Sequence, residues 1–242
     1  MTWFKKWFNT TYYHLLYNNR DYKEAENFID NLIIYLKPKE SAQFFDLACG
    51  KGRHSIFLNK KGFDVVGVDL SEESILTAQE SSNETLYFAV HDMREKFPNH
   101  SFDIVVNLFT SFGYFDDDRE DIDVLKGVVS VLKDDGVFVL DYLNAKQVIK
   151  NIKQQETIQR ENVAFQITKK IENLFVVKGI DFVDKGESYH FEERVKLIDE
   201  DQFDVYFKLA GLRVLAKFGN YNLEAFNENS SPRLILIAEK IG

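Results

Sequence analysis

The sequence is poor in cysteine, proline and glycine. Cys49 is the one cysteine among 242 residues, which excludes a disulfide within the chain, and the five histidines do not have metal-ligand spacing. Three prolines and twelve glycines leave no linker or low-complexity segment, and no internal repeat occurs at solenoid periods. We therefore expect a single domain over residues 1–242 that needs neither disulfides nor a structural metal.

Long apolar runs are also missing. The longest, such as Leu32–Leu36 and Leu234–Ala238, have five residues, whereas a membrane-spanning helix needs roughly 20. The first eight residues carry charge and aromatic side chains but no apolar core of a signal peptide. We therefore expect a cytoplasmic protein.

Basic residues are also fewer than acidic residues. Thirty basic and 39 acidic side chains give a formal net charge of −9, so nucleic acid and anionic membranes would be repelled on average. The aromatic stripe of Trp3, Phe4, Trp7 and Phe8 could dock on a membrane, but in an acidic chain we favour packing as a lid or at a homodimer contact. Neither nucleic acid nor a membrane is an expected partner.

Strand-like and helix-like patterns alternate through the first 144 residues. Short runs, several of them continuously apolar as in parallel strands covered on both faces, predict strands at 44–48, 63–68, 86–90, 102–108 and 137–140. Helical spacing of apolar residues predicts helices at 25–36, 53–61, 72–81 and 118–132. The alternation predicts an α/β fold built on an open sheet.

The pattern changes after Asn144. A short helix at 145–153 precedes three segments, 163–171, 174–183 and 188–198, whose period of two predicts an antiparallel sheet with one wet face. A final helix at 200–209 ends at Gly211, a plausible left-handed cap. Strands at 212–218 and 233–239 close the chain, and we expect an antiparallel pair because no helical stripe separates them.

A glycine turn follows the first predicted strand. Gly50 and Gly52 in Asp46-Leu-Ala-Cys-Gly-Lys-Gly allow a tight turn and a close ligand approach, and the helix behind them presents unpaired N–H groups. Dinucleotide-binding turns carry a third glycine where Ser55 stands here. Asp46 would repel a pyrophosphate but attract an ammonium or a sulfonium. We therefore favour a cofactor loop for a cationic ligand over a generic tight turn with an acidic cap.

Two further acids follow the next two predicted strands. Asp69 comes 19 residues after Gly50, at a strand end where a carboxylate can accept both hydroxyls of a ribose. Asp92 follows the third strand, where it can accept from an adenine amino group while the next backbone N–H serves a ring nitrogen. Each alone could be an ordinary helix-start residue. Together with the glycine turn at one sheet edge, the three acids predict S-adenosylmethionine as the ligand.

Four motifs resemble, in order, those of class I S-adenosylmethionine-dependent methyltransferases: Asp46-Leu-Ala-Cys-Gly-Lys-Gly, Gly67-Val-Asp-Leu-Ser, His91-Asp-Met-Arg and Phe102-Asp-Ile-Val-Val-Asn-Leu. Tyr13, Tyr17 and Arg20, and then Phe109-Thr-Ser-Phe-Gly-Tyr, resemble the small-molecule branch that includes glycine N-methyltransferase and amino-sugar N-methyltransferases. The resemblance implies a Rossmann-like seven-stranded sheet of order 3-2-1-4-5-7-6 with strand 7 antiparallel. It also implies that the β insertion, residues 155–199, helps to cover the substrate.

The resemblance also assigns site residues. It implies that Arg20 pairs with the methionyl carboxylate and that Tyr13 and Tyr17 close over the cofactor. The implied cofactor residues are Tyr17, Arg20, Asp46, Ala48, Gly50, Gly52, Asp69, Leu70, Asp92, Met93 and Asn107, and the substrate or lid residues are Tyr13, Phe109, Phe112 and Tyr114. His54 stands where many members have a further glycine. The acidic metal set of catechol methyltransferases is not recognised, so no metal is expected.

These observations predict in-line transfer of a methyl group from S-adenosylmethionine to nitrogen or oxygen of a small metabolite. His14, Tyr114 and His190 are candidate general bases, or ordinary surface or core residues. A nicotinamide-dependent oxidoreductase is one rival, against which Asp46 and the missing third glycine argue. A cofactor-binding protein without turnover is another. Aminopropyl transfer from the decarboxylated cofactor is a third, which Arg20 disfavours if it meets a carboxylate.

Overall fold

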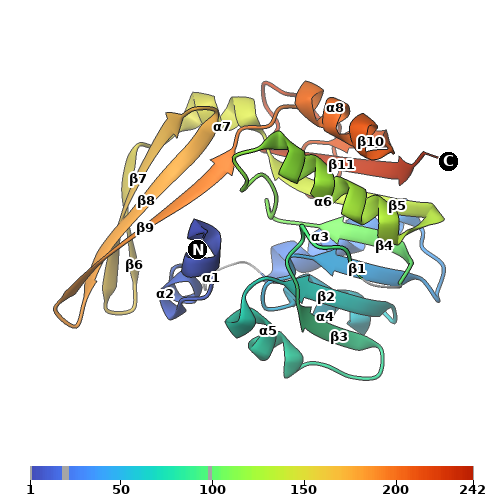
Figure 1. Cartoon of the computed structure of the whole chain (residues 1–242), viewed down its shortest axis with the longest axis horizontal. Coiled ribbons are helices and arrows are strands. Elements are labelled where there is room, and N and C mark those ends of the chain that lie inside the picture. Colours follow the sequence, from blue (N-terminus) through green and yellow to red (C-terminus); the bar gives the residue numbers. More distant parts are fainter. Residues whose placement is uncertain (1, 18–21, 98–99, 242) are drawn as a thin grey trace.

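The main β-sheet has seven strands in the computed structural model, which describes residues 2–17, 22–97 and 100–241. They are β1 (Gln43–Leu47), β2 (Asp64–Asp69), β3 (Leu86–Val90), β4 (Phe102–Asn107), β5 (Leu132–Leu143), β10 (Leu212–Phe218) and β11 (Arg233–Lys240). Their order is β10-β11-β5-β4-β1-β2-β3 (Figure 1). β11 runs antiparallel to both of its neighbours, and the pairs among β1 to β5 are parallel. The predicted sheet order is confirmed.

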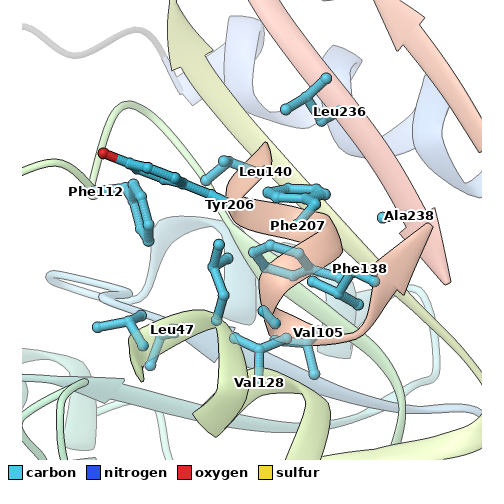
Figure 2. Close-up of a cluster of buried hydrophobic side chains, with 14 of the residues drawn as sticks. Leu47, Val105, Phe112, Val128, Phe138, Leu140, Tyr206, Phe207, Leu236 and Ala238 are labelled. Atoms are coloured by element: carbon cyan, nitrogen blue, oxygen red, sulfur yellow. The ribbon is translucent and has the colours of Figure 1, made fainter. Parts of the chain in front are cut away.

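Two apolar clusters cover opposite faces of this sheet. Residues of one strand alternate between them: Val105 of β4 belongs to the first, and Ile104 and Val106 belong to the second. The first cluster includes residues of α6 (Asp118–Val131) and α8 (Glu200–Ala210), as Figure 2 shows for Val128 and Phe207. The second includes residues of α3 (Tyr22–Leu36), α4 (Arg53–Lys60) and α5 (Glu72–Gln79). Because both faces are covered, the strands have continuous apolar runs.

A four-stranded antiparallel sheet follows the short helix α7 (Ala145–Asn151). Its strands are β6 (Gln155–Arg160), β7 (Val163–Glu172), β8 (Phe175–Asp184) and β9 (Glu187–Lys196), paired in chain order. The sequence predicted three of these strands and missed β6. β6 lies at the sheet edge and pairs only with β7, so its composition is largely polar and gives little strand signal. We call these four strands the insertion sheet.

Two N-terminal helices, α1 (Trp3–Phe8) and α2 (Thr11–Leu16), lie between the insertion sheet and the main sheet (Figure 1). Trp7 and Leu16 are buried in a third apolar cluster with Phe165, Ile180 and Phe182 of the insertion sheet. The sequence predicted the aromatic stripe as a lid or a dimer contact. In the structure, Phe4 and Trp7 pack within the chain and are almost fully buried.

The end of the insertion sheet is fixed to the main domain by Lys196. Its backbone N–H donates to the Gly113 carbonyl at 2.8 Å, and its ammonium group donates to Asp121 at 2.5 Å and Asp118 at 2.7 Å. Burial raises the pKa of Asp121 to about 6, against the opposing effect of the Lys196 charge.

Within the described residues, no helix is both long and apolar enough to cross a membrane.

Candidate functional site

A cavity of about 270 Å³ lies where the carboxyl ends of β1 to β4 meet the N-terminal helices. Parallel strands end at the same sheet edge, and open α/β sheets bind ligands there. Ten of the predicted site residues line this cavity: Tyr13, Tyr17, Ala48, Gly50, Asp69, Leu70, Asp92, Met93, Phe109 and Tyr114. The structure therefore brings together residues that lie up to about 100 positions apart in the chain.

The glycine turn presents its backbone to the cavity at Gly50. This residue has a φ of 58°, and a Cβ built there would have no atom within 4 Å. Its N–H donates to Oδ2 of Asp69 at 2.8 Å, which joins the turn to the end of β2. A ligand can therefore approach the backbone at Gly50 without meeting a side chain.

Gly52 has a different environment, although it lies only two residues further on. It is the left-handed N-cap of α4, with a φ of 77°. A Cβ there would lie 2.6 Å from the Phe88 ring of β3, and Gly52 does not line the cavity. Packing of α4 against β3 therefore accounts for this glycine.

Asp69 is held at the end of β2 by two backbone groups. Gly50 N–H donates to one carboxylate oxygen, and Ser71 N–H donates to the other at 2.8 Å. A carboxylate oxygen can accept a second hydrogen bond. Asp69 can therefore accept from a ligand hydroxyl group while its orientation stays fixed.

Asp92 is held by an ion pair with Arg94. Nε and Nη2 of Arg94 donate to its two carboxylate oxygens at 3.0 and 2.7 Å, and Arg94 also meets Glu120 at 3.1 Å. The hydrogen bonds from Arg94 lower the pKa of Asp92 below its ordinary value. Asp92 is thus a fixed, ionised acceptor in the cavity wall at neutral pH.

Two predicted cofactor residues lie behind the wall. Asp46 is 1% exposed and accepts a hydrogen bond from the Ser55 hydroxyl at 2.5 Å, and burial raises its pKa to about 6. The Asn107 side chain is fully buried and donates to the carbonyls of Leu47 and Ser111 at 2.9 and 3.1 Å. Asp46 therefore connects β1 to α4, Asn107 connects the end of β1 to the segment after β4, and neither residue lines the cavity itself.

Phe112 is a core residue in this structure, whereas the sequence placed it at the substrate. It is 1% exposed and belongs to the first apolar cluster (Figure 2), where its ring packs edge-on against that of Tyr142. The segment after β4 turns at Phe109 and Thr110, so that Phe109, Ser111 and Tyr114 line the cavity and Phe112 does not. Arg20 lies outside the described residues.

Aromatic side chains of the N-terminal helices complete the cavity. Phe4 and Phe8 of α1 line it with Tyr13, and the Phe8 ring lies 4.9 Å from that of Tyr13 and 5.6 Å from that of Tyr114. The aromatic stripe that includes Phe4 and Phe8 was recognised in the sequence. The cavity that these two side chains face was not predicted. Sequence reasoning also missed Arg53, whose guanidinium lies 4.5 Å from the centre of the Phe109 ring.

Within the part of the chain that the structure describes, no residue of the insertion sheet lines the cavity, and this sheet contacts the N-terminal segment that does. A carboxylate on β9, Glu193, accepts from Trp7 Nε1 at 2.6 Å and from the Tyr17 hydroxyl at 2.7 Å. Lys178 of β8 lies 3.4 Å from Glu193 and also donates to the Tyr17 hydroxyl. Burial lowers the pKa of Lys178. We call Trp7, Tyr17, Lys178 and Glu193 the latch.

Comparison with known proteins identifies the family. A family model described as a methyltransferase domain matches residues 38–206. The chain belongs to this methyltransferase family. A Bacillus subtilis (strain 168) protein, YqeM, whose name describes it as a methyltransferase, is 32% identical over 215 residues, 83% of this chain and 85% of that protein. The enzyme class predicted from the sequence is therefore confirmed.

Other methyltransferases are similar in sequence or fold. A glycine/sarcosine N-methyltransferase of Aphanothece halophytica is 34% identical over 130 residues, 52% of this chain and 48% of that protein, and an amino-sugar N,N-dimethyltransferase also matches. An S-adenosylmethionine-dependent methyltransferase of Clostridium acetobutylicum ATCC 824 has the same fold, with a TM-score of 0.81, 23% identity and 96% of each chain covered. The predicted family resemblance and the methyltransferase fold are confirmed.

The latch predicts how this methyltransferase holds its N-terminal helices. Glu193→Gln should leave Lys178 without its buried counter-charge, and we expect a loss of about 3 kcal/mol of stability and faster amide exchange in residues 3–16. Differential scanning calorimetry and hydrogen-exchange mass spectrometry would measure both. Glu192→Gln is the matched control, because its side chain is 44% exposed against 13% for Glu193. Equal exchange in the two variants would contradict the latch.

Proposed function

We propose that this methyltransferase transfers a methyl group from S-adenosylmethionine to the amine nitrogen of a small metabolite. The observation that carries the proposal is a division of the cavity wall. The glycine turn, Asp69 and Asp92 come from the ends of β1 to β3, and the aromatic side chains come from the N-terminal helices and the segment after β4. We assign the first part to the cofactor and the second to the acceptor.

The cofactor part fits an adenosyl amino acid. The open backbone at Gly50 admits a close approach, and two oriented carboxylates, Asp69 and Asp92, suit the hydroxyl and amino groups of a nucleoside. Leu70 and Met93 supply apolar surface beside these acids. When bound there, S-adenosylmethionine supplies an activated methyl group.

The acceptor part suits an amine that gains methyl groups. Phe4, Phe8, Tyr13 and Tyr114 line one side of the cavity, and aromatic faces attract ammonium groups that carry methyl substituents. Relatives named as glycine/sarcosine and amino-sugar N-methyltransferases support nitrogen as the target. The cavity volume of about 270 Å³ is just below the range of about 300–1,000 Å³ that is typical of small-molecule sites.

Alignment and exclusion of water are the main tasks of the protein in such a transfer. The N-terminal helices, whose Phe4, Trp7 and Leu16 are buried, close the cavity from one side, and the wall would orient the acceptor. An amine must lose its proton before it reacts, and we assign the role of proton acceptor to His14, which lines the cavity. His190 is 64% exposed, pairs with Asp181 and lies outside the cavity.

A product assay with matched acceptors tests the proposal. The purified protein would be incubated with methyl-labelled S-adenosylmethionine and either glycine, sarcosine or an amino sugar nucleotide, and each product would be analysed by mass spectrometry. Glycolate is the control for glycine, because a hydroxyl group replaces the amine. We expect N-methylated product and equimolar S-adenosylhomocysteine with at least one amine and none with glycolate. Methylation of oxygen, or no turnover with any amine, would reject the proposal.

A further inference from the structure

The wall segment after β4 has an unusual backbone. Phe109 and Thr110 have φ angles of 62° and 61°, and left-handed backbone is unfavourable for residues with a side chain, above all for β-branched threonine. Outside a two-residue hairpin turn, such as Asn173 and Leu174 between β7 and β8, two such residues in succession persist where neighbouring groups fix them. In this protein these neighbours come from β5 and β11, far along the chain.

Asp141 of β5 and Arg233 of β11 fix the two residues. Asp141 is 1% exposed, its Oδ2 accepts from Phe109 N–H at 2.8 Å, and its backbone carbonyl accepts from Thr110 N–H at 2.9 Å. Arg233 donates through Nε to Oδ1 of Asp141 and through Nη2 to the Thr110 hydroxyl, both at 2.8 Å. The Tyr221 hydroxyl donates to Oδ2 of Asp141 at 3.1 Å. Asp141 and Arg233 thus hold the turn by three hydrogen bonds, while Tyr221 and Arg233 fix the Asp141 carboxylate.

The turn in its fixed form builds the acceptor side of the cavity. Phe109 and Tyr114 line the cavity, and the Tyr114 hydroxyl donates to the Thr110 carbonyl at 2.7 Å. The guanidinium groups of Arg53 and Arg233 lie 4.5 and 6.0 Å from the centre of the Phe109 ring. A Thr110 that relaxed to negative φ would therefore move two aromatic wall residues at once.

We propose that Arg233 and Asp141 are positioning residues for the methyl acceptor. They act through Phe109 and Thr110 and hold the aromatic wall in the conformation that receives the amine. This inference rests on the proposed function in assigning that wall to the acceptor. The cofactor part of the cavity comes from the ends of β1 to β3 and contacts this turn indirectly, through Asn107, which donates to the Leu47 and Ser111 carbonyls, so binding of S-adenosylmethionine should depend on Arg233 much less than acceptor binding does.

Arg233→Met tests the network because it removes the donors and keeps an unbranched side chain. We expect amide exchange at Phe109 and Thr110, measured by NMR, to accelerate at least about tenfold, with exchange in β1 and β2 unchanged. With an amine that the enzyme methylates, KM for the acceptor should rise at least about tenfold, whereas the calorimetric Kd for S-adenosylmethionine should change less than about twofold. Arg213→Met is the control, since Arg213 is 71% exposed on β10.

Two substitutions at Thr110 keep the test valid if Arg233→Met fails to fold. Thr110→Val deletes the hydroxyl acceptor and keeps the strain of a β-branched residue, whereas Thr110→Gly deletes both the hydroxyl and the strain. We expect Thr110→Val to lose acceptor affinity and amide protection, and Thr110→Gly to stay near wild type in both. In the double variant, Thr110→Gly should restore much of the acceptor affinity and amide protection that Arg233→Met loses.

Unchanged exchange at Phe109 in Arg233→Met or Thr110→Val would overturn the network, and so would equal behaviour of the valine and glycine variants. The exchange experiment needs no acceptor. If the exchange experiment confirms the network but no amine is methylated, the proposed function alone is therefore rejected. A Kd for S-adenosylmethionine that rises as much as the acceptor KM would overturn the positioning role.

Discussion

Asp69→Ala is expected to raise the Kd for S-adenosylmethionine about a hundredfold, because hydrogen bonds to a charged group contribute about 1.5–3 kcal/mol each and 1.4 kcal/mol is tenfold in affinity. The substitution removes the carboxylate that we assign to the ligand hydroxyls. It also removes the partner of Gly50 N–H and Ser71 N–H, so the glycine turn loses one of its hydrogen bonds to β2 and keeps the one from Cys49 N–H to the Val68 carbonyl. Isothermal titration calorimetry with S-adenosylmethionine and S-adenosylhomocysteine measures the change.

The matched control for this substitution lies on the same strand. Asp64 is exposed at the other end of β2, and Asp64→Ala should leave the Kd unchanged. NAD and ATP should bind the wild-type protein much more weakly than S-adenosylhomocysteine. An unaltered Kd in Asp69→Ala, or a preference for NAD, would refute the assignment of this part of the cavity.

Gly52→Ala is expected to destabilise the fold by about 3 kcal/mol, from the added cost of left-handed backbone and overpacking. The new Cβ would lie 2.6 Å from the Phe88 ring at a φ of 77°, so either the ring or α4 must shift. At this chain length, the melting temperature should fall by roughly 10 °C. Thermal denaturation followed by circular dichroism gives the value.

Gly50→Ala is the matched partner of this substitution. It should have a small effect on stability and a large effect on cofactor affinity. Its φ of 58° adds backbone strain, but the new methyl group meets no atom within 4 Å and enters the cavity instead. We expect a loss of only about 1 kcal/mol of stability together with an increase of more than about tenfold in the Kd for S-adenosylmethionine. If Gly52→Ala weakened binding more and stability less than Gly50→Ala, the division of roles would be wrong.

The main sheet could be predicted from the sequence because its strands are marked by local patterns of apolar residues. Apolar runs on both faces marked β1 to β5, and Gly211 marked the end of α8 with its φ of 87°. β6 was missed because it is polar and lies at a sheet edge, and the start of β5 was predicted five residues late, at Val137 instead of Leu132. Local patterns identify an element more reliably than they identify its ends.

The site was predictable where it depends on strand ends. Asp69, Asp92 and Gly50 follow successive parallel strands, and such strands deliver their last residues to one sheet edge. The pattern could not show which side chains turn inward at that edge. Asp46 is the clearest example, because the carboxylate assigned to a cationic ligand is 1% exposed and bound to Ser55.

By itself, then, the amino-acid order determined the α/β fold, the edge at which the site lies and the methyltransferase family. Tertiary structure decided which of two neighbouring glycines faces the cavity, how the insertion sheet acts through the latch, and how Arg233 reaches a turn 123 residues earlier in the chain. The physical reason is that hydrophobic periodicity reports whether a residue faces the core. Which residue it contacts across the core depends on packing between distant segments. The hydrophobic periodicity of the sequence contains no information on that contact.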